Sequence, residues 1–276
     1  MLSQALKLVV GRQIASTRPV SSSFFKPRRF YKEVYVDSNQ NGAFEIYLDK
    51  RKLKTPKGKH LELYSEPLAL AIAHEWDSQK ETIQIPAMRL TGLAFTSEDN
   101  PTHETSESIV QKLLEYVDND TILYLNNSPV ELAQLEQERW LPIVDWVNDH
   151  LELKLKPSYT VTDLADVPDE SRSRLQRNFE AMNFHSLTGI AYGVDSIKSV
   201  LLLLAALQHR ITVKEAAELA NLELDYQTKV YSKVEGHHDV HALELVNRLS
   251  AAVLYAQLTS NWHRVTKEKI QLCGSS

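Results

Sequence analysis

Early in the chain, the spacing of apolar residues is that of β-strands. Residues 34–36 and 44–48 are short runs of β-branched and aromatic side chains, and residues 39–42 (Asn-Gln-Asn-Gly) lie between them. Two such runs around an Asn- and Gly-rich turn are typical of a β-hairpin. Another short strand is expected at residues 61–63. Residues 32–64 are therefore predicted to form a small, locally connected antiparallel sheet.

From residue 65 onward, apolar residues recur at intervals of three or four, which is the period of an α-helix. Leu68, Ile72 and Trp76 form one apolar stripe and predict a helix that ends near Gln79. The rest of the chain is therefore predicted to be mainly helical. Further helices are expected at about residues 105–117, 169–182 and 196–209, and near the C-terminus around the stripe Ala242, Val246, Leu249 and Val253.

Residues that favour helix N-termini mark three of the helices in this region. Residues 128–131 (Ser-Pro-Val-Glu) combine a capping serine with a proline in the first turn, and Thr212 with Glu215 forms a capping box. Asp239 is expected to cap the last helix. The longest connection is expected at residues 153–168, which contain two prolines.

The two patterns together predict an α+β fold. A small antiparallel β-rich N-terminal domain, residues 32–64, is followed by a mainly helical C-terminal domain, residues 65–276. Hydrophobic residues make up 43% of the chain and charged residues 24%. Both fractions are ordinary for a globular protein and exclude a fibrous or wholly disordered one.

Charge is unevenly distributed along the chain. Residues 1–30 hold six basic side chains and no acidic ones, whereas the rest holds 25 basic and 36 acidic ones, a net charge of −11. Apolar residues recur at helix-like intervals between the leader's cations, and a basic amphipathic leader of this kind is typical of a mitochondrial transit peptide. We therefore predict a transit peptide at residues 1–31, a mature start near Lys32 and localisation to the mitochondrial matrix.

The other interpretation of the leader is a cationic arm that binds nucleic acid or a membrane surface. The acidic body argues against it, because an acidic surface repels phosphate, so no nucleic-acid partner is predicted. The longest apolar run, residues 200–207, is much shorter than the roughly 20 residues that a membrane-spanning helix needs. No membrane span is predicted either.

The motifs of common enzyme classes are missing from the sequence. It has no Gly-rich phosphate loop and no Gly-x-Ser-x-Gly elbow, so no cofactor, stable small-molecule ligand or catalytic residue is predicted. Its one cysteine, Cys273, lies near the C-terminus and can form neither an intramolecular disulfide nor a cysteine-based zinc site.

A histidine cluster leaves one enzymatic alternative open. His237 and His241 are four residues apart and would share a helical face, where Glu235 or Asp239 could add a third ligand to a divalent metal. The order His-Glu-x-x-His of zinc hydrolases is not present, so no metal is predicted. A matrix metallo-enzyme built on His237, His238 and His241 remains the alternative.

Two acidic residues and two tryptophans could each have either a structural or a functional role. Glu223 and Asp225 are two apart and point to different faces of a helix, so their spacing does not make a general acid–base pair. They are either part of a solvated acidic face or contacts for a basic partner segment. Trp76 and Trp140 are interpreted as core residues. The acidic residues Asp99, Asp118 and Asp120 could bind a metal, but residues 118–121 favour a turn.

A set of short motifs dispersed along the chain indicates the function more specifically than any one of these features. The motifs are residues 75–79 (EWDSQ), Ile83, Met88, 90–91 (LT), 99–101 (DNP), 118–122 (DNDTI), 140–142 (WLP) with Trp146, 196–199 (SIKS), 222–223 (LE), 226–227 (YQ), Glu235 and 238–239 (HD). In order and spacing they resemble one family, the mitochondrial F₁-ATPase assembly chaperones dedicated to the α subunit, often called assembly factor two. The sequence departs from the family pattern at Arg89, where proline is common, and at Tyr231-Ser232, where Trp-Gly is expected.

The resemblance implies a chaperone, not an enzyme, that holds unassembled F₁ α subunits until β subunits replace it. A lone subunit of a ring exposes an apolar assembly face, and such a face aggregates unless it is covered. The resemblance also implies a functional role for Glu223. Glu223, Asp225 and Glu235 are therefore predicted partner contacts, whereas Trp76, Asp77, Trp140 and Asp239 are predicted to maintain the structure. A general matrix holdase without a fixed client is a further alternative.

Overall fold

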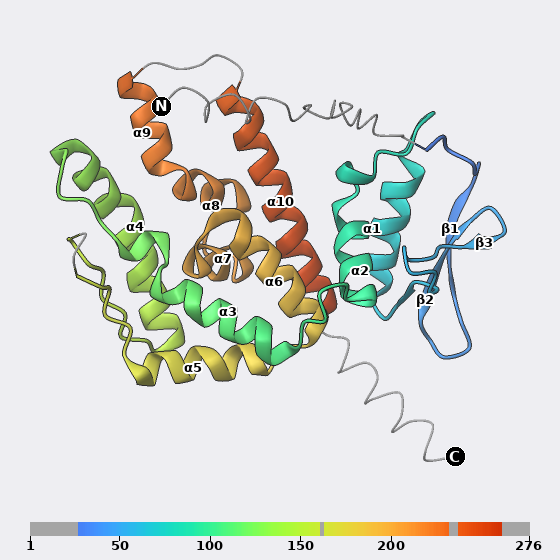
Figure 1. Cartoon of the computed structure of the whole chain (residues 1–276), viewed down its shortest axis with the longest axis horizontal. Helices are drawn as coiled ribbons and strands as arrows, with labels where there is room; N and C mark the ends of the chain where they lie inside the picture. Colours follow the sequence, from blue (N-terminus) through green and yellow to red (C-terminus); the bar gives the residue numbers. More distant parts are fainter. Residues whose placement is uncertain (1–26, 161–162, 232–236, 261–276) are drawn as a thin grey trace, which may run out of the picture.

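The structure is a computed structural model that describes residues 27–160, 163–231 and 237–260, with only the backbone at 231 and 237–239 (Figure 1). Nearly all of the predicted transit peptide and the predicted contact Glu235 lie outside the described residues. Strands come first along the chain and helices follow, so the predicted α+β fold is confirmed. No helix in the described ranges is long and apolar enough to cross a membrane.

The N-terminal sheet is antiparallel and is built around one central strand. Strand β2 (Phe44–Leu48) pairs with β1 (Val34–Ser38), β3 (Arg51–Lys52) and β4 (Glu62–Leu63). The β1–β2 turn closes because Gly42 adopts a positive φ of 76° and the Asn39 side chain accepts hydrogen bonds from two backbone N–H groups of the turn.

Helix α1 (Glu66–Asp77) covers the buried face of this sheet, and helix α2 (Arg89–Asp99) packs against α1. Helix α1 begins at Ser65, whose hydroxyl accepts a hydrogen bond from the Leu68 N–H. Its buried stripe Leu68, Ile72 and Trp76 is the predicted one, and it packs with Ile46 of β2 in one core cluster. After a 3₁₀ turn at Ile85–Ala87, helix α2 adds to the same cluster.

The remaining helices surround a second and larger core. The short helix α7 lies at its centre, and seven of its eight side chains are buried. The elements of this part, in chain order, are α3 (Ser106–Asp118), a 3₁₀ turn at Thr121–Leu123, α4 (Val130–Leu151), α5 (Asp169–Glu180), α6 (Phe184–Ile197), α7 (Val200–Leu207), α8 (Val213–Ala220), α9 (Leu222–Tyr231) and α10 (His237–Thr259).

Helix α10 joins the two cores. Leu245 and Leu249 belong to the larger core, whereas Ala251 and Tyr255 of the same helix belong to the core under the sheet. The Tyr255 hydroxyl lies 2.6 Å from the Ser97 hydroxyl of α2, and both side chains are buried. In Figure 1, α1 and α2 accordingly lie between the sheet and the pair α6 and α10.

The sequence pattern did not predict helix α6, although it is central to the packing. Its glycines Gly189 and Gly193 are weak helix formers, and they obscure the apolar period. A Cβ at Gly189 would lie 3.1 Å from the backbone nitrogen of Ala256, and one at Gly193 would lie 2.9 Å from Leu203. Close packing of α6 against α10 and α7 therefore requires glycine and outweighs local propensity.

Two details of the predicted helix ends are wrong. The cap position of α4 is Pro129, not Ser128, and no side chain caps it. Helix α10 begins at His237, so Asp239 lies inside its first turn instead of capping it. By contrast, the predicted capping box of Thr212 and Glu215 is confirmed at α8.

Candidate functional site

The motif residue Glu75 connects two helices of the N-terminal part. Its two carboxylate oxygens accept hydrogen bonds from the backbone N–H groups of Leu90 and Thr91, at 2.9 and 2.8 Å, and from the Thr91 hydroxyl at 2.6 Å. A carboxylate of α1 therefore caps the N-terminus of α2, where orphan N–H groups need acceptors. Burial raises the pKa of Glu75, although these hydrogen bonds act in the opposite direction.

The neighbouring residues Trp76 and Asp77 hold the segment that precedes the sheet. Trp76 is buried, and its carbonyl accepts a hydrogen bond of 2.7 Å from the Tyr31 hydroxyl. Asp77 forms an ion pair of 3.2 Å with Arg29, but its side chain is 63% exposed. These contacts agree with a structural role, and the buried tryptophan contributes far more packing than the exposed carboxylate.

The three aspartates considered as possible metal ligands all form hydrogen bonds or ion pairs with other residues of the chain. Asp120 is fully buried and accepts hydrogen bonds from the Ser199 hydroxyl at 2.6 Å and the Leu201 N–H at 2.9 Å, which caps α7. Burial raises its pKa to about 6 in spite of these bonds. Asp99 accepts hydrogen bonds from Thr55 and Lys57, and Asp118 pairs with Arg172.

The Trp140 side chain connects α4 to α8 in the larger core. Its ring is completely buried in α4, and its Nε1 donates a hydrogen bond of 3.0 Å to the Leu219 carbonyl at the end of α8. Because the indole N–H has a hydrogen-bond acceptor, burying the tryptophan leaves no unpaired polar group in the core. The predicted structural role of Trp140 has a direct physical basis here.

Glu223, the predicted contact on α9, belongs to a small buried network. The side-chain amide of Asn126 donates to the Glu223 carboxylate and to the Glu136 carboxylate, both at 2.6 Å. The Asn126 backbone N–H donates a further bond of 2.6 Å to Glu136. Glu223 is half-buried, whereas Glu136 of α4 is fully buried. The amide group of one asparagine thus joins two carboxylates and ties α9 to α4.

Glu136 is the member of this network that the sequence interpretation missed. Burial raises its pKa, and the nearby Glu223 carboxylate raises it further, whereas the Asn126 bonds lower it. A signal was available, because Glu136 lies four residues after Leu132 and four before Trp140, on the buried stripe of α4. A carboxylate on an apolar stripe predicts a buried polar partner.

Asp225 differs from Glu223 although only one residue separates them. About 200° of helix rotation lies between the two side chains, so when Glu223 faces α4, Asp225 faces away from it. Asp225 is exposed, which agrees equally with a solvated acidic face and with a partner contact. The structure therefore does not bring the predicted contacts together into one site. Glu235 and the side chain of Asp239 lie outside the described residues.

The helices α8, α9 and the first half of α10 form one end of the molecule, which we call the α8–α10 end (residues 213–231 and 237–247; Figure 1). Large apolar side chains are exposed here on α9 and α10, namely Leu224, Val230, Val240 and Leu243. In the described part of the chain, no three His, Cys, Asp or Glu side chains are arranged to hold a metal ion. His241 is exposed, and the side chains of His237 and His238 lie outside the described residues.

Comparison with known proteins finds similarity to the same family that the motifs resemble. The profile of the ATP12 chaperone protein family matches residues 28–148. The mitochondrial protein atp12 of Schizosaccharomyces pombe is 28% identical over 253 residues, covering 87% of this chain and 86% of the relative. The crystal structure of Atp12 from Paracoccus denitrificans superimposes with a TM-score of 0.76 at 26% identity, covering 84% of this chain and 98% of that one. The chain is similar to the ATP12 chaperone family in both sequence and structure.

The similarity extends well beyond the residues that the profile matches. The mitochondrial protein ATP12 of Saccharomyces cerevisiae is 22% identical over 274 residues and covers 83% of each chain. The likeness to ATP12 proteins therefore covers most of the helical part as well as the residues that the profile matches. The resemblance inferred from the motifs is confirmed, and the protein is a chaperone of ATP synthase assembly.

Proposed function

We propose that this protein binds the unassembled α subunit of F₁ in the mitochondrial matrix and holds it until β subunits take its place. The observation that carries this proposal is the likeness to Atp12 proteins over more than four fifths of the chain, in both sequence and structure. The cationic leader supports the matrix as the compartment, because the 30 residues at the N-terminus contain no acidic side chain.

Simple physics supports a chaperone that works without a nucleotide cycle. Each subunit of a ring has faces that its neighbours cover after assembly, and before assembly these apolar faces aggregate. A partner that covers such a face can be released by competition with the true neighbour, because both bind the same surface. The sequence has no phosphate-binding loop, which agrees with release by competition.

A capture experiment tests the proposal. The full chain is immobilised and exposed to separately expressed α and β subunits of F₁, and the bound subunit is quantified. We expect retention of α and little retention of β, followed by release of α when β is added. Binding of neither subunit would contradict the proposal, and equal binding of both would favour the general holdase.

The metallo-enzyme is separated by metal analysis of the purified protein. Stoichiometric zinc or iron that is lost in a variant carrying His237→Ala and His241→Ala would favour it. A metal content below one tenth of an equivalent in both proteins is the result that we expect.

A further inference from the structure

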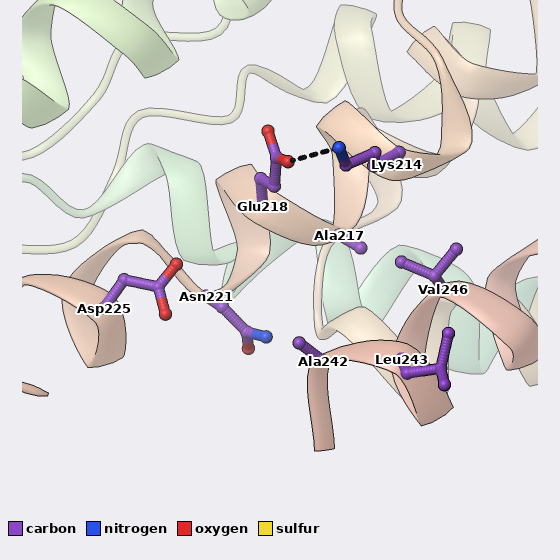
Figure 2. A pocket seen from close by; sticks show the side chains of 8 residues that line it. All are labelled: Lys214, Ala217, Glu218, Asn221, Asp225, Ala242, Leu243 and Val246. Carbon is purple, nitrogen blue, oxygen red and sulfur yellow. Dashed lines mark ion pairs between the residues drawn. The ribbon is translucent and has the colours of Figure 1, made fainter. Parts of the chain in front are cut away.

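An apolar pocket opens between α8 and α10 at the α8–α10 end (Figure 2). Its volume is about 300 Å³. Ala217 of α8 faces Leu243 and Val246 of α10 across it, and Figure 2 shows Asp225 at the opposite edge from these two. The complete lining is Lys214, Ala217, Glu218, Asn221, Asp225, Ala242, Leu243 and Val246.

The side chains on the α10 wall lie open to solvent. Leu243 is 63% exposed and Val240 is 69% exposed, and a spacing of three residues places them side by side on the helix surface. Isolated exposed leucines are common on protein surfaces and need no explanation. Here, however, Leu243 borders a hollow whose other wall is also apolar, so a ligand can bury Leu243 from two directions.

Two of the three charged side chains that line the pocket are acidic and one is basic. Lys214 is the only cation in the lining, and its ammonium group lies 3.7 Å from the Glu218 carboxylate (Figure 2). Among the residues that the structure describes, no cationic group lies within 4 Å of the Asp225 carboxylate. The edge of the pocket near Asp225 therefore fits a positively charged group better than a negative one.

The size and chemistry of the pocket fit a side chain of another protein better than a metabolite. Small-molecule sites range from about 300 to 1,000 Å³ and place several polar groups so that they converge on the ligand. This pocket is at the lower limit of that range, and its centre is lined by alanine, leucine and valine. Apolar anchors that enter such hollows are the usual centres of protein–protein interfaces.

We infer that this pocket receives an apolar side chain of the unassembled α subunit, next to a lysine or arginine of the same segment that faces Asp225. The inference rests on the proposed function, because it supplies the contact for that same client. It also gives Glu223 and Asp225 different roles. Asp225 contacts the client, whereas Glu223, bonded to Asn126, positions α9 so that Asp225 faces the pocket.

Two leucine variants test the pocket. Leu243→Glu places a charge at its edge, and the matched control Leu70→Glu makes the same change at a 54% exposed leucine of α1, in the other part of the molecule. The affinity of the full chain for the purified α subunit is measured by titration, and the melting temperature is measured beside it. We expect Leu243→Glu to bind at least tenfold more weakly, Leu70→Glu to bind within twofold of wild type, and both to melt near wild type.

A second pair of variants tests the same pocket without changing Leu243. Ala242→Phe fills the exposed side of the hollow with an uncharged group, and we expect a similar loss of affinity if filling excludes the client. Asp225→Lys reverses the charge at the edge, and we expect it to weaken binding more than Asp225→Asn does. If Leu243→Glu lowers the melting temperature, its weaker binding could come from misfolding. In that case Ala242→Phe and Asp225→Lys test whether the pocket binds the α subunit.

The possible failures are distinguishable. If wild type captures α and both Leu243→Glu and Ala242→Phe capture it equally well, the pocket is not the contact, and the proposed function stands. Equal weakening by Leu243→Glu and Leu70→Glu overturns the pocket as well, because added charge anywhere would then explain the loss. If wild type does not bind α at all, the proposed function fails and the pocket inference fails with it.

Discussion

The part of the molecule around the sheet and the α8–α10 end use polar residues in opposite ways. Around the sheet, the carboxylates of Glu75 and Asp99 are turned inward and accept backbone hydrogen bonds from a different element. At the α8–α10 end, Asp225 is exposed and large apolar side chains such as Leu243 lie open to solvent. The Glu75 and Asp99 carboxylates of the first region contribute to folding, whereas we propose that Asp225 and Leu243 of the second contact a partner.

We expect this difference to separate residues that maintain the fold from residues that contact the client. The motif at residues 75–79 is highly recognisable because each of its residues serves the fold, through a cap, a buried ring, an ion pair or a turn. Leu243 belongs to none of the motifs. The motif at residues 75–79 therefore lies in a different region from the proposed contact, and variants should separate the two.

The largest effect is expected at a fold-maintaining residue. Trp140→Ala removes a fully buried ring and leaves the Leu219 carbonyl without its donor. The free energy of unfolding should fall by about 3–5 kcal/mol, as in other large-to-small core changes. Denaturant titration measures it. The variant should still bind α through its folded fraction, and a loss of binding in fully folded protein would place Trp140 in the contact instead.

The next effect is expected at Asp120 and depends on pH. Asp120→Asn turns one acceptor into a donor opposite the Ser199 hydroxyl or the Leu201 N–H, and should cost about 1–3 kcal/mol at pH 7. The folded-state pKa of about 6 lies above the ordinary value of 3.8, so the folded chain keeps a proton that the unfolded chain loses as the pH rises. The contribution of Asp120 to stability therefore falls by about 2 kcal/mol between pH 4 and pH 6.

Comparing the two proteins isolates this pH dependence from that of other carboxylates. The advantage of wild type over Asp120→Asn, measured by denaturant titration, should be larger at pH 4.5 than at pH 7. An advantage that grows with pH would mean that the folded protein favours the ionised form of Asp120.

A smaller effect on stability is expected at Glu223. Glu223→Gln removes a negative charge beside the buried Glu136, and the free energy of unfolding at pH 7 should stay level or rise by up to about 1 kcal/mol. Glu223→Lys loses the bond to Asn126 and should weaken capture of α with a melting temperature near wild type. A fall of several degrees in both variants would show that the carboxylate itself is needed for folding.

The smallest effect is expected at Asp77. Its ion pair with Arg29 is exposed on the Asp77 side, and such pairs contribute between zero and about 1 kcal/mol. Asp77→Asn should change the free energy of unfolding by less than about 0.5 kcal/mol, with no effect on capture of α. Thermal unfolding at low and high salt measures this change. A loss of stability above about 1 kcal/mol would show that Asp77 contributes more to the fold than an exposed ion pair does.

Local signals predicted those elements that local chemistry decides. The turn at residues 39–42, the stripe of Leu68, Ile72 and Trp76, and the box of Thr212 and Glu215 all rest on residues close together in sequence, and the structure has them. Helix α6 was missed because its glycines serve a contact with α10, more than 60 residues away.

The site could be predicted only in part, for the same reason. The long helix α10 has two apolar stripes, and either could have been the buried one. Ala242 was expected to be buried but is exposed, whereas Leu245 is buried. Which stripe is buried depends on α6 and α8, which pack against the helix. Without that choice, the exposure of Leu243 and the pocket beside it could not be inferred from sequence.

Hydrogen–deuterium exchange of the full chain, with and without the F₁ α subunit, tests the division between the two regions most directly. We expect the α subunit to slow exchange in residues 213–231 and 240–247 and to leave the strands at residues 34–63 unchanged. Protection confined to the sheet, with no change at the α8–α10 end, would contradict it.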